Sequence, residues 1–328
     1  MRRRALIVGL VCFVGGSRFA ASSQPAKVRI GYLAPSSVNH PLAHRNVTAF
    51  REALAALGYL EGQNIEVEYR FAENQFDRLP ALAAELVRLS VAVIVAGPTL
   101  AAVAAKGATS TIPIVMINTF DPVGLGLVAN LARPGGNVTG LAFTVGAEIF
   151  GKGFDIFREA IPELRRVAVL SNPANPAHAI VLRGLQTAVG GLGIELRFYE
   201  ARVPQDFESA FRAISEARAG GLYVIPDVLF VSQAASVAAL ATAYKLPSLH
   251  QFREEVVAGG LLAYGHSNTD PWRHAATFVD RLLKGAKAAD LPVQQPTKFE
   301  LAINLRTAKA IGLTIPPTLL ARADEVIE

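Results

Sequence analysis

The chain has 328 residues, of which 51% are hydrophobic and 18% are charged. These fractions are typical of a well-packed globular protein and exclude a largely disordered one. The formal net charge of +5 suggests a nucleic-acid partner at first sight, but four of the arginines lie near the N-terminus: Arg2, Arg3, Arg4 and Arg18. Without them the net charge falls to +1, and nucleic-acid binding is no longer expected.

The N-terminus has the pattern of an export signal. Arg2 to Arg4 form a positive region, the stretch from Ala5 to Gly16 is apolar but short for a membrane span, and small residues follow as far as Ser23. We therefore expect a signal peptide over residues 1–23 and a soluble periplasmic protein after cleavage, with a membrane anchor as the alternative. The single cysteine, Cys12, lies in this segment, so the mature chain would contain no thiol, as suits an oxidising compartment.

From Lys27 onward, short apolar runs alternate with longer amphipathic ones. This alternation predicts parallel strands covered by helices. In the first half we expect four strands, at Val28–Leu33, Ile65–Tyr69, Val91–Ala96 and Ile114–Asn118. The intervening helices are expected at about Pro41–Leu57, at Phe76–Leu89 and from Thr99 onward.

A second pass of the same order begins near Arg166. Its strands are expected at Val167–Leu170, Ile194–Tyr199, Gly221–Ile225 and Pro247–Leu249, and its helices end near Val189, Ala217 and Tyr244. The segment GYLEGQNIEVEY in the first half has a counterpart, GGLGIELRFYE, in the second. The sequence therefore predicts an α/β protein with two similar Rossmann-like lobes, each built on a parallel sheet.

Three segments are predicted to cross between the lobes, because they break helical periodicity with glycine, proline and polar residues: Arg133–Glu148, Gly259–Ser267 and Pro296–Leu305. A chain that crosses repeatedly gives a hinge instead of a loose linker. We expect residues 27–142 and about 267–296 in the first lobe, and residues 143–266 and about 297–328 in the second.

Candidate ligand-binding residues follow the predicted strands, since ligands of open parallel sheets collect at the carboxyl ends of the strands. Ser36, Ser37 and Thr99 suit a carboxylate, and Asp121 and Asp227 could hold an ammonium group. Together they suggest a zwitterion such as an amino acid. The alternative is that these residues only cap helices and turns. Three aromatic residues could stack on a flat ligand or pack in the core: Phe120, Phe143 and Tyr264.

Signals for catalysis are weak. Gly124, Gly126 and Ala129 match the dinucleotide fingerprint, but they follow the fourth predicted strand where that motif follows the first. No phosphate-binding loop or nucleophile elbow occurs. His40 and His44 have helical spacing, but Pro41 lies between them and no glutamate completes a zinc motif. No nucleophile, base and acid stand out as a set, so we expect neither an enzyme, a cofactor nor a metal.

From Val28 to Glu328 the chain resembles the ABC-transporter substrate-binding proteins of the tryptophan/phenylalanine-binding type. The resemblance is carried by ALGYLEGQNIEVEYRFAE, RLPALAAELVRLSVAVIVA, ATSTIPIV, DPVGLGLVANLARPGGNVTGL, RVAVLSNPANPAH and QPTKFELAINLRTAKAIGLTIPPTLLARADEVIE. It implies a type I periplasmic-binding fold, a ligand enclosed between the lobes by hinge closure, and delivery to an ABC permease with its ATPase. A monomer is expected for such a receptor.

Carried over by position, the resemblance implies ligand contacts from both lobes. The first lobe and the hinge would supply Ser36, Ser37, Thr99, Asp121 and Thr144, and the second lobe would supply Asn172, Asn175 and Asp227. Two other functions remain open. One is a ligand-sensing protein that serves a sensor kinase or a chemoreceptor, and the other is a two-lobed enzyme that uses a nucleotide.

Overall fold

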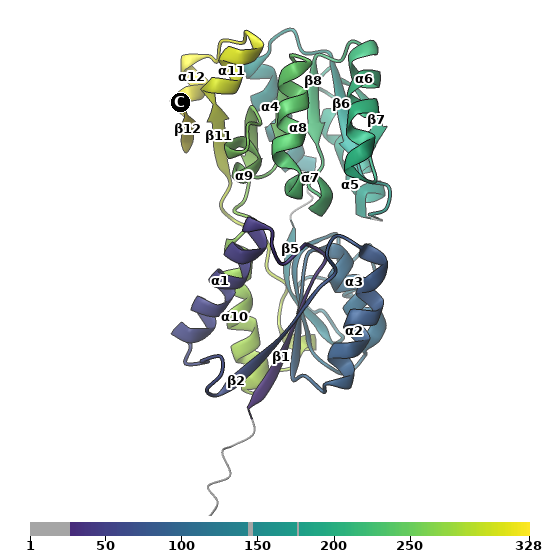
Figure 1. The fold of residues 1–328 in the computed structure, drawn as a ribbon, viewed down its shortest axis with the longest axis vertical. Coiled ribbons are helices and arrows are strands. Elements are labelled where there is room, and N and C mark those ends of the chain that lie inside the picture. The colour runs from purple at the N-terminus through teal and green to yellow at the C-terminus, as the bar shows by residue number, and fades with distance from the viewer. Residues whose placement is uncertain (1–26, 144–146, 176) are drawn as a thin grey trace, which may run out of the picture.

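The structure is a computed structural model that describes residues 27–143, 147–175 and 177–328. They form two α/β lobes placed end to end (Figure 1). The predicted signal peptide lies outside the described residues. Within the part of the chain that is described, no helix is long and apolar enough to cross a membrane.

The first lobe contains a five-stranded sheet in the order β2-β1-β3-β4-β5, with all neighbours parallel. Its strands are β1 (Val28–Ala34), β2 (Ile65–Phe71), β3 (Val93–Ala96), β4 (Ile114–Phe120) and β5 (Val138–Phe143). Its helices are α1 (Pro41–Ala56), α2 (Leu79–Arg88), α3 (Thr99–Ala108) and α10 (Asp270–Leu283), with short 3₁₀ turns at Phe76–Arg78 and Ala288–Asp290.

Helices cover both faces of this sheet. In Figure 1, α1 and α10 lie on one side and α2 and α3 on the other, and α10 returns from the C-terminal half of the sequence. Successive residues of a strand point to opposite faces, and β1 follows this rule. Ile30 and Tyr32 pack with the α1 and α10 side, whereas Leu33 packs with the α2 and α3 side. Both faces of the inner strands are buried, so β3 and most of β1 and β4 are apolar, whereas the edge strand β2 is partly exposed and carries charged residues.

The second lobe contains a seven-stranded sheet in the order β12-β11-β10-β9-β8-β6-β7. Its strands are β6 (Arg166–Ser171), β7 (Glu195–Glu200), β8 (Gly221–Val224), β9 (Ser248–His250), β10 (Leu262–Gly265), β11 (Glu300–Asn304) and β12 (Glu325–Ile327). Its helices are α4 (Ala147–Ala160), α5 (Ala177–Val189), α6 (Phe207–Glu216), α7 (Val228–Ser232), α8 (Ala234–Ala243), α9 (Arg253–Val257), α11 (Leu305–Ile311) and α12 (Pro317–Leu320), with a 3₁₀ turn at Pro204–Asp206.

The two sheets share one strand order. Read from its outer edge, the second sheet runs β7-β6-β8-β9-β10, which corresponds to β2-β1-β3-β4-β5 of the first. The prediction of two similar α/β lobes in tandem is therefore confirmed. It was incomplete in one respect: β11 pairs antiparallel with β10, so the second sheet is mixed and not wholly parallel.

The segments predicted as crossings contain strands. β5, β10 and part of β11 lie within them, because short apolar runs next to glycine were interpreted as extended linkers. The connections are shorter than expected: residues 266–269 join β10 to α10, and residues 291–299 lead from the first lobe to β11. The second of these connections is held against β5, because Gln294 donates to Gly140 O (2.9 Å) and accepts from Ala142 N (2.9 Å).

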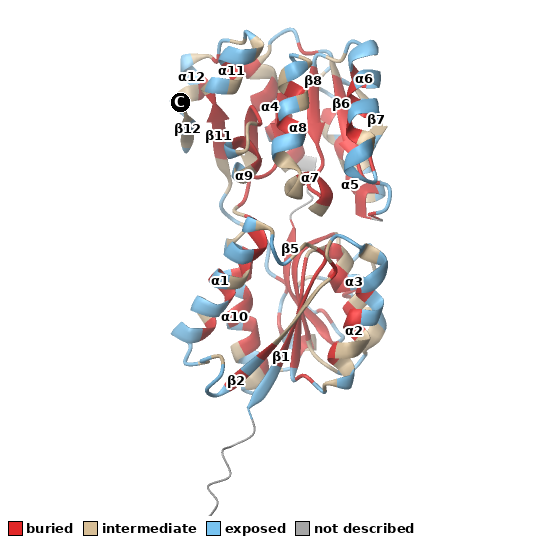
Figure 2. Ribbon diagram, in the orientation of Figure 1, coloured by how far each residue is buried: buried red, intermediate tan, exposed pale blue. Residues whose placement is uncertain are grey.

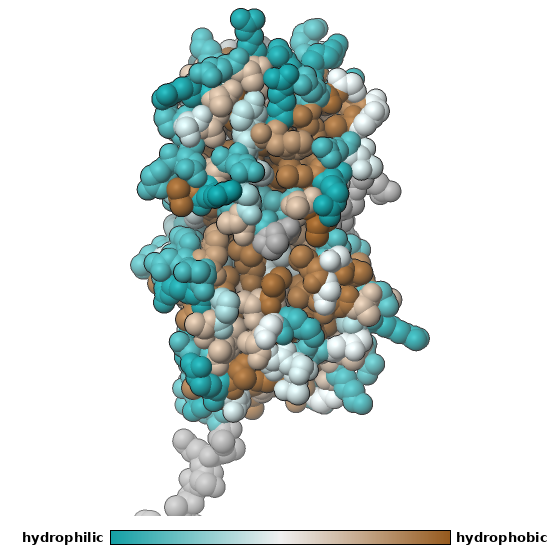
Figure 3. All heavy atoms as spheres, turned by 90° about the vertical axis from the view of Figure 1, so that its right-hand side faces the viewer, coloured by the Kyte–Doolittle hydropathy of each residue, from teal (hydrophilic) through white to brown (hydrophobic). Residues whose placement is uncertain are grey.

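The buried residues concentrate on the strands and on the helix faces that meet them (Figure 2). Each lobe has its own core clusters of buried residues, and the largest cluster, centred on the second-lobe sheet, also includes Phe120 and Phe143 from the ends of β4 and β5. On the face shown in Figure 3, apolar residues also occur on both lobes beside their junction. The junction is therefore bordered by apolar surface from both lobes, and Phe120 and Phe143 pack across it.

Candidate ligand-binding site

A cavity of about 90 Å³ lies between the lobes, whereas one water molecule needs about 10–15 Å³. Its first-lobe walls come from the carboxyl ends of β1, β3 and β4 and from the first turns of α1, α3 and α10. The second lobe contributes Asn175, Pro226 and several residues of α7. The cavity thus lies where the strand ends of both sheets converge, which is the expected position for a ligand in this type of fold.

Most of the cavity wall is apolar and aromatic. Tyr32 stacks on Trp272 with ring centroids 5.0 Å apart, and Phe143 packs between Phe120 (4.2 Å) and Phe252 (6.0 Å). All five side chains are buried and line the cavity. Aromatic walls of this kind suit a large apolar or aromatic group, because such surfaces gain from burial and from stacking.

One end of the cavity offers hydrogen-bond donors. Ser36 follows β1, and Thr99 and Leu100 form the first turn of α3. The N-cap residue of α3 is Pro98, which makes no side-chain cap, so the first backbone N–H groups of the helix lack a side-chain acceptor. The hydroxyl of Thr99 accepts from Phe120 N (3.1 Å), which fixes its position beside β4. Hydroxyls and a helix N-terminus together favour an anion such as a carboxylate.

Asp227 is the centre of a buried network in the second lobe. Its Oδ1 accepts from Asn172 Nδ2 (3.0 Å) and from Leu229 N (3.0 Å), and its Oδ2 accepts from Asn175 Nδ2 (2.8 Å). His178 Nε2 lies 3.3 Å from Oδ2, a close contact that is poorly aligned for a full hydrogen bond. The carboxylate therefore has donors on both oxygens from its own lobe.

The protonation state of this network follows from its contacts. Burial raises the pKa of Asp227, but the contacts from His178, Asn172 and Asn175 outweigh that effect, and the pKa lies below its usual value. His178 Nδ1 accepts from Asn172 N (2.9 Å), so in neutral His178 the proton is on Nε2, facing Asp227. Asp227 is thus a negative charge at the second-lobe side of the cavity.

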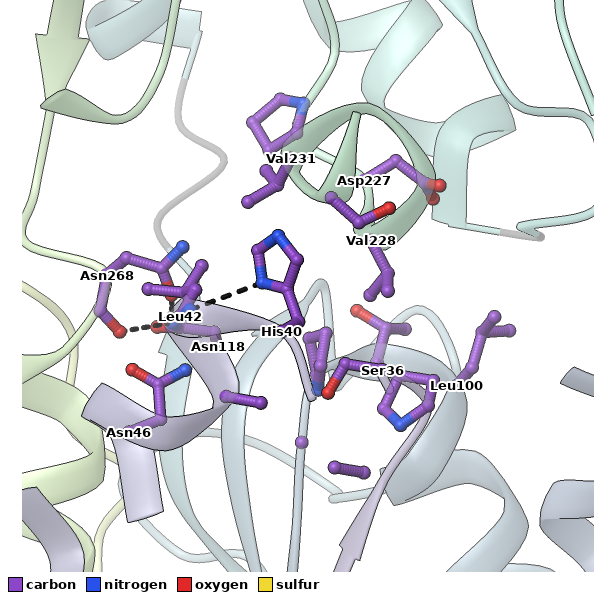
Figure 4. A pocket seen from close by; sticks show the side chains of 18 of the residues that line it. Ser36, His40, Leu42, Asn46, Leu100, Asn118, Asp227, Val228, Val231 and Asn268 are labelled. Carbon is purple, nitrogen blue, oxygen red and sulfur yellow. Dashed lines mark hydrogen bonds between the residues drawn. The ribbon is translucent and has the colours of Figure 1, made fainter. Parts of the chain in front are cut away.

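His40 lies in the middle of the cavity wall (Figure 4). It is the N-cap of α1, and its Nδ1 accepts from Leu42 N (3.2 Å). Burial lowers the pKa of His40, an effect that the backbone of Ser232 opposes and Arg45 reinforces. Because Ser232 belongs to α7 of the second lobe, His40 is a point of contact between the lobes.

Three asparagines form an amide cluster, here Asn46, Asn118 and Asn268, at the first-lobe side of the cavity. Asn118 Nδ2 donates to Asn268 O (3.3 Å), and Asn46 Oδ1 accepts from the hydroxyl of Thr269 (3.2 Å). The sequence analysis did not select the three asparagines, which come from distant parts of the chain, and it considered His40 only as a possible metal ligand. The one available signal was that Asn118 follows the apolar run of β4.

The predicted ligand-binding residues divide into two groups. Six line the cavity: Ser36, Thr99, Phe120, Phe143, Asn175 and Asp227. Four others do not, namely Ser37, Asp121, Asn172 and Tyr264, and Thr144 lies outside the described residues.

The residues away from the cavity have local partners. Ser37 Oγ accepts from Asn39 N (3.3 Å), and Asp121 Oδ1 accepts from Gly124 N (2.9 Å) in the turn after β4. Asn172 donates a hydrogen bond to Asp227 and does not itself line the cavity. Tyr264 stacks on Phe299 with ring centroids 6.1 Å apart. In the structure, Ser37 and Asp121 therefore stabilise local turns, as the alternative interpretation of capping residues expects.

One arrangement resembling a catalytic triad was missed by the sequence analysis. His250 Nε2 lies 3.0 Å from Ser248 Oγ, and its Nδ1 lies 3.2 Å from Glu255 Oε1. All three residues are about 1% exposed, and none lines the interlobe cavity. A substrate has no access to this serine, so the set connects β9 to α9 within the core.

Other chemical signals also lack the required context. Gly124, Gly126 and Ala129 lie in a series of turns and not at the start of a helix, so the structure does not support a dinucleotide site there. Among the residues with described positions, no group of three or more His, Cys, Asp or Glu is arranged to hold a metal ion.

The comparisons with known proteins agree with the fold. Residues 34–327 match the family model described as ABC transporter substrate binding protein. A tyrosine-binding protein from Clostridioides difficile (strain R20291) is 27% identical over 276 residues, covering 84% of this chain and 79% of that protein.

Solved structures of similar fold cover nearly the whole chain. A conserved domain protein from Vibrio cholerae O1 biovar eltor superposes with a TM-score of 0.86 at 28% identity, covering 92% of this chain and 99% of that one. The ABC domain from Streptococcus pneumonia in complex with L-Trp gives 0.85 at 23% identity, covering 92% and 100%. A ligand-free, open substrate binding protein from Clostridium difficile gives 0.67 at 24% identity, covering 92% and 99%.

Proposed function

Because the chain belongs to the family of ABC transporter substrate-binding proteins, we propose that it is the extracytoplasmic receptor of an ABC importer for an aromatic amino acid. The observation that carries the proposal is the interlobe cavity, in which aromatic walls are combined with polar groups from both lobes. The family itself binds substrates and is not an enzyme family.

The polar groups of the cavity fit the two charges of an amino acid. Ser36, Thr99 and the N-terminus of α3 would hold the carboxylate. The ionised Asp227 would attract the ammonium group, although its hydrogen-bonding capacity is largely used within its own lobe. In Figure 4, Ser36, Leu100 and Asp227 lie on the same side of His40, so both charged groups of one small ligand fit there.

The ligand side chain would extend the other way, between Tyr32, Trp272, Phe143 and Leu42. The relatives support this class of ligand, since one is a tyrosine-binding protein and another was solved with L-Trp. Burial of an aromatic side chain contributes on the order of 1.5–3 kcal/mol, which would make the ring the main source of affinity.

Binding would close the two lobes around the ligand, with the three connections between them as the hinge. Closure is stabilised only to the extent that the ligand binds the closed form better than the open one. The higher TM-score against the L-Trp complex than against the open, ligand-free structure supports a closed arrangement here. The closed receptor, after removal of its signal peptide, would act as a monomer on a permease with its ATPase.

A thermal-shift screen tests this function. Protein starting at Lys27 would be refolded to remove any bound ligand and then mixed with L-tyrosine, L-tryptophan, L-phenylalanine or ATP. A ligand at a hundredfold its Kd stabilises by about 2.7 kcal/mol, which corresponds to a rise in melting temperature of roughly 4 °C in a protein of this size.

Two analogues serve as matched controls for the charged groups of the ligand. Tyramine lacks the carboxylate, and 3-(4-hydroxyphenyl)propionate lacks the ammonium group. We expect a shift with the amino acids and a much smaller one with either analogue. A shift with ATP and none with the amino acids would contradict the receptor function and favour a nucleotide-using enzyme.

A further inference from the structure

Asn118 has an unusual backbone for a buried residue that is not glycine. Its φ is +47°, in the left-handed region, where asparagine is among the few tolerated side chains. It is 5% exposed and lines the cavity at the end of β4. A strained and buried position beside a cavity is typical of a residue kept for function.

The orientation of its amide is fixed by its neighbour. The Nδ2 of Asn118 faces two oxygens of Asn268, the backbone carbonyl at 3.3 Å and Oδ1 at 3.5 Å. The backbone carbonyl only accepts, so the nitrogen must face Asn268 and the Oδ1 of Asn118 must face elsewhere. Asn268 belongs to the connection between β10 and α10, so this contact attaches the amide to the hinge.

The Oδ1 of Asn118 is buried and has no hydrogen-bond partner among the described residues. A buried acceptor without a donor is costly, and buried polar groups in proteins are rarely left in this state. Among the residues that line the cavity, it is the only side-chain atom with this property in the described part of the chain.

We propose that Asn118 determines specificity by accepting a hydrogen bond from an N–H or O–H group on the side chain of the ligand. The assignment rests on the receptor function proposed above. In Figure 4, Asn118 and Asn268 lie on the opposite side of His40 from Ser36 and Leu100, so Asn118 is placed at the side-chain end of the ligand. An aromatic ligand with a donor, such as tyrosine or tryptophan, satisfies Oδ1, whereas phenylalanine buries it unpaired.

Calorimetric titration with L-tyrosine, L-tryptophan and L-phenylalanine tests this assignment. A buried acceptor left unpaired lowers affinity by about 5- to 150-fold, so we expect the wild-type protein to bind phenylalanine more weakly by that factor. Asn118→Gly keeps the left-handed backbone, which glycine adopts readily, and removes the amide. This variant should lose affinity for tyrosine and tryptophan, whereas its affinity for phenylalanine should be unchanged or higher, because the unpaired acceptor is gone.

Asn74 offers a matched control, because it has the same kind of backbone (φ +61°) on an exposed surface away from the cavity. Asn74→Gly should leave all three affinities unchanged. Equal binding of the three ligands by the wild-type protein, or an equal loss for all three in Asn118→Gly, would overturn the role of Asn118 while leaving the receptor function intact. Failure of the wild-type protein to bind any of them would overturn both.

Discussion

Asp227→Ala is the substitution that most sharply tests how the second lobe is held at the cavity. The carboxylate receives hydrogen bonds from Asn172, Asn175 and Leu229, and His178 lies 3.3 Å from it. Alanine would leave these donors buried without an acceptor and would remove the N-cap of α7. We therefore expect a loss of stability as well as a loss of ligand binding.

The size of the loss follows from the number of donors. Each buried donor left unpaired costs about 1–3 kcal/mol, but relaxation and relief of the desolvated charge reduce the sum. Removing one partner of a buried charged network typically costs about 3–5 kcal/mol, which is the value we expect. Asp227→Asn keeps the volume and one acceptor, so it should cost about 1–3 kcal/mol.

Urea unfolding followed by circular dichroism measures this difference. The matched control is Asp155→Ala, an exposed aspartate of α4, which should change the free energy of unfolding by less than about 0.5 kcal/mol. A loss below about 1 kcal/mol in Asp227→Ala would refute the network, and Asp227 would then act on the ligand alone.

Three further predictions concern pH, a close backbone contact and the buried serine. Burial lowers the pKa of His266, an effect that Ser267 and Asp270 oppose, so the folded state holds its neutral form. The free energy of unfolding therefore has its full value above the pKa of histidine in the unfolded chain, about 6.5. It decreases as the pH falls below that value toward the lower pKa of the folded state. Unfolding free energies at about pH 7.5 and about pH 5 should show this decrease, with a smaller slope in His266→Gln; an unchanged slope would contradict the assignment. Gly140→Ala should destabilise by more than about 3 kcal/mol, since φ is +123° and a Cβ would lie 2.2 Å from Met116 O; a near-normal melting temperature would refute this packing. Ser248→Ala should lower the free energy of unfolding by about 1–3 kcal/mol, because His250 loses its hydrogen-bond partner. If the wild-type protein hydrolysed an ester and this substitution abolished that activity, the structural role of Ser248 would be contradicted.

The strands were largely predictable because both faces of each sheet are covered. β1, β4 and β6 are almost entirely apolar, and a run of this kind between turn residues has few other structures available. β10 and β11 were not predicted, because they lie in glycine-rich and proline-flanked stretches. Their antiparallel pairing depends on where the chain returns after α10, which no local pattern indicates.

The site was predictable only where it follows the strand-end rule. That rule selected Ser36, Thr99 and Asp227, which follow predicted strands in the sequence and line the cavity. It also selected Asp121, whose carboxylate accepts a hydrogen bond from Gly124 N within the turn after β4. Which of two similar aspartates faces a cavity is decided by backbone geometry and by partners far away in the sequence, and the sequence alone carries neither.

The most direct test of the interlobe site uses Trp272, the single tryptophan of the chain, which lines the cavity and is 3% exposed. Its fluorescence would be followed during titration with L-tyrosine and L-phenylalanine, with calorimetry on the same sample. We predict a saturable change in Trp272 emission that follows the binding heat at a one-to-one ratio. Binding heat without any change in emission would show that the ligand binds elsewhere and would contradict the site described here.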